Sequence, residues 1–476
     1  RLVLVILWFT LEVPGQPSME NEQCNNDDGS GSCGAKQQEW EPKSMSVVLP
    51  CFNEEKFAIQ TVKAVYNSVP EDILKEIIVV DDGSDEDLGK TVLLSKVRKK
   101  YKVKLLKHKE SQGLIKAKFT GGFAATGDII VFFDCHVSPI KGWHAIFMDK
   151  MRTNYRRVVV PRITNLDIDT WKEKYAGGDA GFSSCYMTWD VDFKWFDAPD
   201  EYVPVLSGGL LGISRPWFNE TGGYDEQMIG WGGENIDQSL RTWLCGGEIV
   251  AAMDARVAHM WRTPDDPRTL SKKPANGYAA IRNKVRAGVA WMGNFSKKFS
   301  DFDMMEHFKN NPVELGDLSN ILDVSRKRHC RPFAWFLHRF RNVYEDGGLL
   351  PSETFQLRLP GRKKCLQFLG AAGTSQTGVG RVKLVKCNAK DDRQRWHLGN
   401  VDLQSGGKGK CCGGLRAWNT DQCLQPDGDK IATGVCDISG KKVAATAQRV
   451  ALSAEGHLQF QSPYTNTQCA ELSGKQ

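Results

Sequence analysis

The chain has no long run of basic residues, and the apolar run near its start is too short to cross a bilayer. Its 63 Lys and Arg nearly balance 57 Asp and Glu, and the net charge of +6 is spread over 476 residues. This balance gives no support to nucleic-acid binding. A composition of 41% hydrophobic and 25% charged residues excludes a mainly disordered chain, and the length predicts two or three domains.

The beginning of the chain is interpreted as a membrane attachment followed by a linker. Leu2–Phe9 is an unbroken apolar run that falls short of the ~20 residues that span a bilayer. A polar segment, Ser18–Gln38, follows it. We therefore predict that residues 1–10 are the luminal remnant of a signal anchor and that residues 11–44 form a stem. A signal-peptide remnant is the alternative.

Cysteine is sparse through most of the chain and concentrated near its end. Seven of the 14 cysteines lie between Cys365 and Cys469, which predicts a C-terminal part stapled by disulfides. Two glycosylation sequons begin at Asn219 and Asn294. Both features favour an oxidising secretory compartment.

From Met45 onward, short β-branched runs alternate with longer amphipathic ones. The pattern predicts strands at residues 46–49, 76–80, 103–106 and 129–133, and helices at 54–69 and 113–126. Such alternation predicts a parallel sheet covered on both faces by helices. Ligands of such sheets bind outside the carboxyl ends of the strands. Those ends carry Asn53, Asp81, Asp82, Asp134 and His136.

The composition shifts after Gly347-Gly348, and we place a domain boundary near Pro351, between units 45–350 and 351–476. The second unit contains an internal repeat, because Cys-Leu-Gln occurs at 365–367 and again at 423–425. A third start appears at 468–470. Repeats of ~40 to 60 residues predict supersecondary units around a shared core. The repeat also suggests that Cys365 pairs with Cys387, and Cys423 with Cys436.

Three residues form a candidate metal site. Asp134 and His136 lie two apart at a predicted strand end, so that their side chains face the same way if the chain stays extended. His259 follows another short strand and is the best distant third ligand. One carboxylate with two imidazoles suits Mn²⁺, Zn²⁺ or Fe²⁺ and does not choose among them. The alternative is that both histidines are satisfied polar residues in loops.

Further polar residues could bind a nucleotide or a sugar, and each has a structural alternative. Asp81 and Asp82 could cap a helix or bind ribose or uracil. Arg262 could hold a pyrophosphate or form a surface salt bridge. The run 231–235 (WGGEN) could place an aromatic ring over a sugar or could be a packed turn.

The chain contains a set of motifs in the order in which one protein family has them. They are SVVLPCFNEE, KEIIVVDDGS, QGLIKAK, VFFDCH, GGYDEQMIGWGGEN, VAHMWR and HCRPFAWFL. On these motifs, from about Met45 to the end, the chain resembles the polypeptide N-acetylgalactosaminyltransferases. The resemblance implies an α/β catalytic domain of the GT-A fold at 45–350 and a ricin-type β-trefoil lectin domain at 351–476, its third repeat truncated. It also implies transfer of GalNAc from UDP-GalNAc to Ser or Thr hydroxyls of polypeptides with retention of configuration, which initiates mucin-type O-glycosylation. A transferase for another UDP-sugar and an inactive glycan-binding homologue are the alternatives.

The resemblance assigns roles to individual residues. The metal is Mn²⁺, with Asp134, His136 and His259 as ligands, and Cys33 would pair with Cys330. A single-pass type II Golgi membrane protein with a luminal catalytic domain is implied. Catalytic roles fall on Asp134, Glu234, Arg262 and Trp231, and substrate contacts on Asp81, Asp82, Lys116, Gly208, Gly209 and Asn235.

Several positions depart from the family pattern. Cys135 stands where serine is usual, and Lys116 and Lys118 replace arginines, which keeps the charge and loses bidentate geometry. In the lectin part, Gln367 and Gln425 stand where an Asp accepts hydrogen bonds from GalNAc. We therefore expect weak or absent binding of glycopeptides by that domain.

Overall fold

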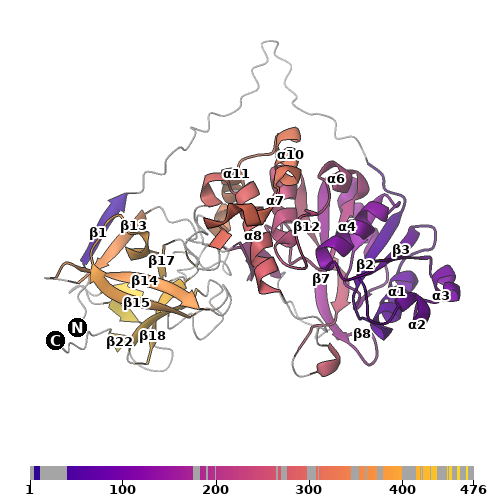
Figure 1. Cartoon of the computed structure of the whole chain (residues 1–476), viewed down its shortest axis with the longest axis horizontal. Helices are drawn as coiled ribbons and strands as arrows, with labels where there is room; N and C mark the ends of the chain where they lie inside the picture. Colours follow the sequence, from indigo (N-terminus) through magenta and orange to yellow (C-terminus); the bar gives the residue numbers. More distant parts are fainter. Residues whose placement is uncertain are drawn as a thin grey trace, which may run out of the picture.

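The computed structural model describes residues 5–10, 40–174, 183–188, 191–198, 200–263, 266–269, 276–296, 307–308, 310–344, 353–359, 362–372, 379–398, 414–418, 420, 422–428, 430–436, 448, 450–452, 458–460 and 468–469. Two units are visible in Figure 1, an α/β unit drawn in indigo to red and a β unit in orange and yellow. The predicted boundary at 350/351 lies outside the described residues, between Tyr344 and Glu353. The domain limits therefore stay predictions.

A nine-stranded sheet forms the centre of the α/β unit. The strand order is β4-β3-β2-β5-β11-β7-β12-β6, with β8 paired to β7. The strands are β2 (Met45–Cys51), β3 (Leu74–Asp81), β4 (Val103–Lys107), β5 (Ile129–Phe132), β6 (Val137–Pro139), β7 (Arg157–Asp167), β8 (Lys172–Lys174), β11 (Leu211–Ser214) and β12 (Glu248–His259). A separate hairpin joins β9 (Ser183–Met187) to β10 (Phe193–Asp197).

The sheet is mixed, so the prediction of a parallel sheet is confirmed for β2 to β5 and for the pair of β7 with β12, and wrong for the other pairs. Strands β2 to β5 pair in parallel, but β11 runs antiparallel to β5 and β7, and β6 runs antiparallel to β12. Parallel neighbours need a long crossover connection, usually a helix. Strand β6 follows β5 after four residues with no helix between them, so the strand and helix alternation that predicted parallel pairing ends there.

Helices cover both faces of this sheet because its buried strands are apolar on both sides. Val47 and Val79 pack with α1 (Lys56–Ser68) and α5 (Trp143–Arg152), whereas Val48 and Val80 pack with α4 (Leu114–Ala124) and α7 (Glu234–Leu244) on the other face. The six strands and helices predicted for residues 46–133 all occur within a few residues of their predicted limits. The other helices are α2 (Leu88–Thr91), α3 (Ser95–Lys100), α6 (Arg215–Glu220), α8 (Gly277–Trp291), α10 (Ser319–Lys327), α11 (Phe333–Arg339) and α12 (Arg341–Tyr344).

Two disulfides cross the α/β unit. One joins Cys51 at the end of β2 to Cys135, and the other joins Cys245 to Cys330. The predicted pairing of Cys330 with Cys33 is therefore wrong, and Cys33 itself lies outside the described residues. The end of α7 lies beside the start of the segment that leads to α11, where Arg331 N–H donates to Leu244 O at 2.8 Å, and this contact brings Cys245 to Cys330.

The C-terminal unit contains a closed sheet of seven strands, because β13 pairs with β16 as well as with β14. Its core includes Phe355, Leu366, Trp396 and Leu424. The strands are β13 (Glu353–Arg358), β14 (Lys364–Ala372), β15 (Val379–Lys386), β16 (Arg395–Leu398), β17 (Leu415–Ala417), β18 (Gln422–Asp427) and β19 (Lys430–Val435). A further sheet holds β20 (Val450–Leu452), β21 (Leu458–Phe460) and β22 (Gln468–Cys469). This arrangement fits the predicted β-trefoil.

The repeats of this unit have the disulfides that the sequence suggested. Cys365 pairs with Cys387 and Cys423 with Cys436, so both pairings are confirmed. Strand β1 (Val5–Thr10) pairs antiparallel with β13. Among the described residues, no helix has the length and apolarity to cross a membrane. The anchor predicted at residues 1–10 and the stem at 11–44 stay predictions.

Candidate metal and donor site

Three strand ends bring the predicted metal ligands together. Asp134 follows β5, His136 directly precedes β6, and His259 ends β12. The antiparallel pairing of β12 with β6 places His259 opposite Val137, beside His136. His259 Nε2 lies 3.0 Å from Asp134 Oδ2, and one ligand atom of each of the three residues lies within 4.8 Å of the others.

The surroundings of this cluster fit a bound divalent cation. A carboxylate and two imidazoles are a donor set that transition metals accept. Nδ1 of His259 is buried and has no hydrogen-bond partner in the described part of the chain. A Cβ at Gly209 would lie 2.7 Å from Asp134 Oδ2, so glycine leaves the space beside the carboxylate open. The disulfide at Cys135 anchors the loop between the first two ligands.

The charges near the cluster keep its carboxylate ionised. Burial raises the pKa of Asp134, but His259, His136 and Lys118 outweigh that effect and hold it below its ordinary value. An ionised carboxylate is the form that binds a cation. The Lys118 ammonium is buried and donates a hydrogen bond to Gly208 O at 2.6 Å, and it lies over the ring of Tyr224.

Sequence reasoning missed Glu54, which connects the metal cluster to Arg262. Glu54 is 7% exposed. Its Oε1 lies 3.2 Å from His136 Nδ1 and accepts a hydrogen bond from Arg262 Nη2 at 2.6 Å. Burial raises the pKa of Glu54, but the opposite effect of the neighbouring His136 and Arg262 is larger and holds the pKa below its ordinary value. Carboxylates that orient metal-binding histidines are common behind metal sites.

The local backbone explains how Glu54 enters the site. Asn53 and Glu55, on either side of it, have φ angles of 54° and 44°, in the region that residues other than glycine seldom adopt. This turn follows β2 directly. Asn53 was recognised as a polar residue at a strand end, and the same position rule would have found its neighbour.

Asp81 and Asp82 are buried and already bonded within the protein. Asp81 accepts hydrogen bonds from the backbone N–H groups of Ser84 and Leu88. Asp82 accepts from His108 at 2.7 Å and from the side chain or backbone of three further residues, Ser111, Gln112 and Gly113. Both therefore shape the loops at the strand ends, and their contact with uridine stays a prediction.

The residues predicted to lie along the sugar meet at the start of α7. Glu234 is buried, and its Oε2 accepts a hydrogen bond from Gly232 N–H at 2.8 Å. Asn235 donates to Leu206 O at 2.9 Å. A Cβ at Gly208, whose φ is +104°, would lie 3.2 Å from Asn235 Cβ. Gly208, Gly209, Glu234 and Asn235 are thus neighbours beside Asp134.

Trp231 and Lys116 lie at the edges of this region. Trp231 is 60% exposed, in a loop whose flanks are fixed by Asn283, which donates hydrogen bonds to Ile229 O and Gly232 O. The Lys116 ammonium lies over the ring of Phe119 and 3.8 Å from Glu226. The roles predicted for Trp231 and Lys116 stay predictions.

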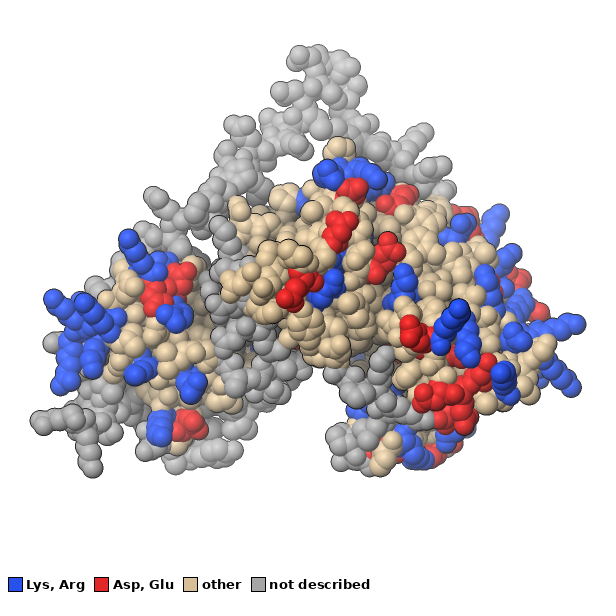
Figure 2. All heavy atoms as spheres, in the orientation of Figure 1, with Lys and Arg blue, Asp and Glu red and all other residues tan. Residues whose placement is uncertain are grey.

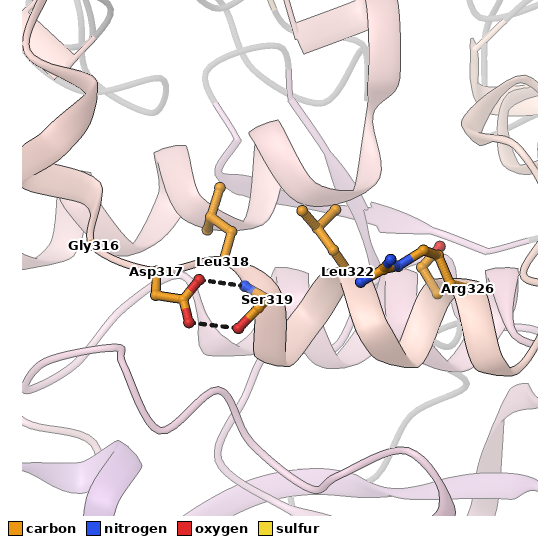
Figure 3. Close-up of a pocket in the computed structure, with 7 residues that line it drawn as sticks. Gly316, Asp317, Leu318, Ser319, Leu322 and Arg326 are labelled. Carbon is orange, nitrogen blue, oxygen red and sulfur yellow. Dashed lines mark hydrogen bonds between the residues drawn. The ribbon is translucent and has the colours of Figure 1, made fainter.

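A separate open pocket of about 590 Å³ lies at the start of α10 (Figure 3). Asp317 points toward Ser319 there and accepts hydrogen bonds from its N–H and hydroxyl, so these two donors at the start of the helix are already bonded. None of the predicted site residues lines it. The lining residues are Gly316, Asp317, Leu318, Ser319, Leu322, Ser325 and Arg326.

Comparisons with known proteins agree with this architecture. The model of glycosyl transferase family 2 matches residues 46–221, and that of the N-terminal domain of galactosyltransferase matches residues 193–263. The chain is 33% identical over 322 residues to human polypeptide N-acetylgalactosaminyltransferase 15, which covers 65% of this chain and 48% of that protein. It is 30% identical over 365 residues to human polypeptide N-acetylgalactosaminyltransferase 13, covering 73% and 63%.

A solved structure supports the fold. The crystal structure of GalNAc-T7 with UDP, GalNAc and Mn²⁺ superimposes with a TM-score of 0.61 at 22% identity, over 88% of this chain and 77% of that one. The match spans about half the length of human polypeptide N-acetylgalactosaminyltransferase 15. The predicted GT-A fold is confirmed. The chain is similar in sequence to the polypeptide N-acetylgalactosaminyltransferases, and residues 46–221 match the model of glycosyl transferase family 2.

Proposed function

We propose that the protein transfers GalNAc from UDP-GalNAc to Ser or Thr hydroxyls of polypeptides, with retention of configuration. The observation that carries the proposal is the meeting of Asp134, His136 and His259 within 4.8 Å, beside Arg262 and the Gly208-Gly209 backbone. The names of the relatives support this activity and a polypeptide acceptor.

The metal that we propose is Mn²⁺, held by Asp134, His136 and His259, in line with the cation in the GalNAc-T7 structure. Bound there, Mn²⁺ would supply positive charge to the diphosphate as UDP departs. Zn²⁺ and Fe²⁺ accept the same donor set, so the identity of the metal needs its own measurement.

The protein's own residues would bind and orient the donor. Arg262 presents a guanidinium that is 35% exposed and held by Glu54 and Thr269 O, a geometry suited to a phosphate. Glycine at 208 and 209 lets the backbone approach the sugar closely, and Glu234 offers a carboxylate there. With the acceptor hydroxyl on the same face, the leaving phosphate oxygen can take its proton, so the chain supplies position and charge stabilisation.

The first experiment is a panel of UDP-sugars, each tested for hydrolysis and for transfer to a Ser/Thr peptide, with Mn²⁺ or chelator. We expect UDP-GalNAc to be preferred and activity to vanish with chelator. Preference for another UDP-sugar would support the alternative donor. Absence of turnover with every sugar, together with peptide or glycan binding, would support an inactive homologue.

A His259→Ala variant tests the metal cluster directly. The variant should lose hydrolysis and transfer together while its unfolding temperature stays near that of wild type. A matched control is His329→Ala, an exposed histidine beyond α10 that takes no part in the proposed site. Retained activity in His259→Ala would remove this residue from the metal site.

We also propose that the protein is a single-pass type II Golgi membrane protein with a luminal catalytic domain. Four disulfides in the described part of the chain and two sequons support an oxidising compartment. Protease protection of microsomes that contain the native protein, followed by alkaline extraction, tests both points. Digestion of the catalytic domain in sealed vesicles would contradict the topology.

A further inference from the structure

The positive charge of the chain resides in its C-terminal unit. Residues 351–476 contain 18 Lys and Arg against 10 Asp and Glu, a net charge of +8, whereas residues 1–350 contain 45 against 47 and are slightly acidic. Figure 2 shows Lys and Arg gathered at the outer end of the β unit, with few acidic groups near them. A local charge of this kind attracts anionic partners.

Four of these cations are brought together at one end of the β14–β15 hairpin, and we call them the basic end. Lys364 pairs directly opposite Lys386, and Cys387 N–H donates to Lys363 O at 3.1 Å. All four side chains are exposed. No acidic side chain in the described part of the chain forms an ion pair with them. The members are Arg362, Lys363, Lys364 and Lys386.

The fold enforces this arrangement although it costs stability. Like charges directly opposite across a strand pair destabilise the pair. The disulfide between Cys365 and Cys387 holds the two strand ends at this register, immediately beside Lys364 and Lys386. The backbone positions of these cations are therefore set before any partner arrives, which lowers the entropy that binding must overcome.

The same hairpin carries two further exposed cations on the other side of β15. Arg381 and Lys383 are exposed and lie two residues apart, on the same face of the strand and ~7 Å apart. Lys386 alternates onto the opposite face, so these two cations add to the positive charge of the hairpin and are not part of the basic end.

Gln367 and Gln425 stand where the resemblance implies sugar-binding Asp residues. Gln367, in the place of the first sugar-binding Asp, donates a hydrogen bond to Asp391 at 2.6 Å. Gln425, in the second, accepts one from Gln448 at 2.8 Å. Both side chains are engaged within the protein. These two side chains are therefore not free to bind sugar, whereas the exposed cations of the basic end remain open to a partner.

We propose that the basic end binds an acidic segment of the polypeptide acceptor, remote from the Ser or Thr that receives the sugar. This proposal rests on the proposed function, which supplies the polypeptide acceptor. Four exposed cations without an acidic partner in the described part of the chain are complementary in charge to such a segment. A sulfated glycan or an anionic membrane is the competing polyanion and becomes an outcome of the test.

The test uses the full chain and two acceptor peptides with one Ser/Thr core, joined by a Gly/Ser linker to a segment of Asp and Glu or to its Asn and Gln counterpart. At low salt the acidic peptide should have a KM about tenfold lower, the scale that several exposed ion pairs supply together. Raising the salt should remove this difference. Values of kcat should be similar for both peptides.

The matched variants each neutralise four exposed cations. Changing the four members of the basic end to Gln should raise the KM of the acidic peptide to that of the neutral peptide, and leave the neutral peptide unchanged. The unfolding temperature of this variant should be equal to or above that of wild type, because the repulsion between the like charges of Lys364 and Lys386 is removed. The control K63Q/K96Q/K99Q/K104Q changes four exposed lysines of the α/β unit and should keep the preference for the acidic peptide.

Equal KM values for the two peptides in wild type, or equal losses in both variants, would overturn the proposal. So would binding of heparin or of phosphatidylserine vesicles through the basic end without any preference for acidic peptides. If wild type transfers to no peptide, the proposed function has failed on its own. Fluorescence anisotropy with the two labelled peptides then still tests the surface, since only the acidic one should bind.

Discussion

Removing the disulfide between Cys51 and Cys135 should both destabilise the α/β unit and weaken its metal site. The bridge closes a loop with a sequence separation of 84 residues. In the chain-entropy model, a loop of that length contributes about 4.5 kcal/mol to the free energy of unfolding. Both cysteines are buried, so the variant C51A/C135A also loses packing. We therefore expect a loss of about 4 to 5 kcal/mol in urea unfolding.

The effect on metal binding follows from the position of Cys135 between two predicted ligands. The bridge ties Cys135 to the end of β2, so Asp134 and His136 are carried on a loop that is covalently fixed. Mutation of groups that orient metal ligands typically lowers the affinity for the metal by about 10-fold to 100-fold. Titration calorimetry without urea, at a temperature at which the variant is folded, should show that its affinity for Mn²⁺ is lower by at least about tenfold.

A second disulfide provides the control and the refuting outcome. Cys423 and Cys436 close a separation of only 13 residues in the C-terminal unit, for which the same model gives about 3 kcal/mol. The variant C423A/C436A should lose that stability and keep its Mn²⁺ affinity. If C51A/C135A binds Mn²⁺ as tightly as this control does, the argument that the bridge positions the ligands is wrong.

Three further predictions concern single residues. Gly209→Ala places a Cβ 2.7 Å from Asp134 Oδ2 and should weaken Mn²⁺ binding by calorimetry, whereas unchanged affinity would show that the carboxylate can move freely. Lys118→Met removes the hydrogen bond to Gly208 O and should raise the KM for UDP-GalNAc with little change in the peptide KM; Lys104→Met, which removes a surface bond to Ala124 O, should change neither. The pKa of Glu54 is lowered, so its ionised form stabilises the fold above its ordinary pKa of 4.5, and this stabilisation is lost as the pH falls below that value. Chemical unfolding of metal-free protein should therefore depend more steeply on pH from about 6 to about 3 than unfolding of Glu54→Gln, and equal slopes would contradict the assignment.

Local sequence patterns predicted the first half of the α/β unit because its elements follow one another with strand and helix periods. Runs such as Ile77–Val80 are apolar on both sides, and Ala58, Val62 and Val65 recur at helical spacing. The strand order beyond β5 could not be read in this way. Strand β11 enters the sheet between β5 and β7, and only contacts between distant segments fix that choice.

The site shows the same division between local and distant information. Asp134 and His136 share one strand end, so their proximity could be predicted from spacing. The sequence offered His259 only as a candidate third ligand. The register between β12 and β6 places it opposite Val137, beside His136. Glu54 contacts His136 and Arg262, and Lys118 contacts Gly208, all far from them in the chain. The strand-end rule covers Glu54 as it covers Asn53, but these distant contacts carry no spacing signal, so the sequence did not show which partners Glu54 has.

Two departures from the pattern that the resemblance implies, Cys135 and Lys118, lie near the predicted metal ligands and leave those ligands in place. Cys135, where serine is usual, forms a covalent bond to the end of β2. Lys118, where arginine is usual, gives one ammonium to one carbonyl oxygen in a buried place. In this chain both residues hold the backbone near the predicted ligands, Cys135 through a disulfide and Lys118 through a hydrogen bond. The disulfide variant therefore measures how much of the geometry of the predicted metal site the bridge supplies.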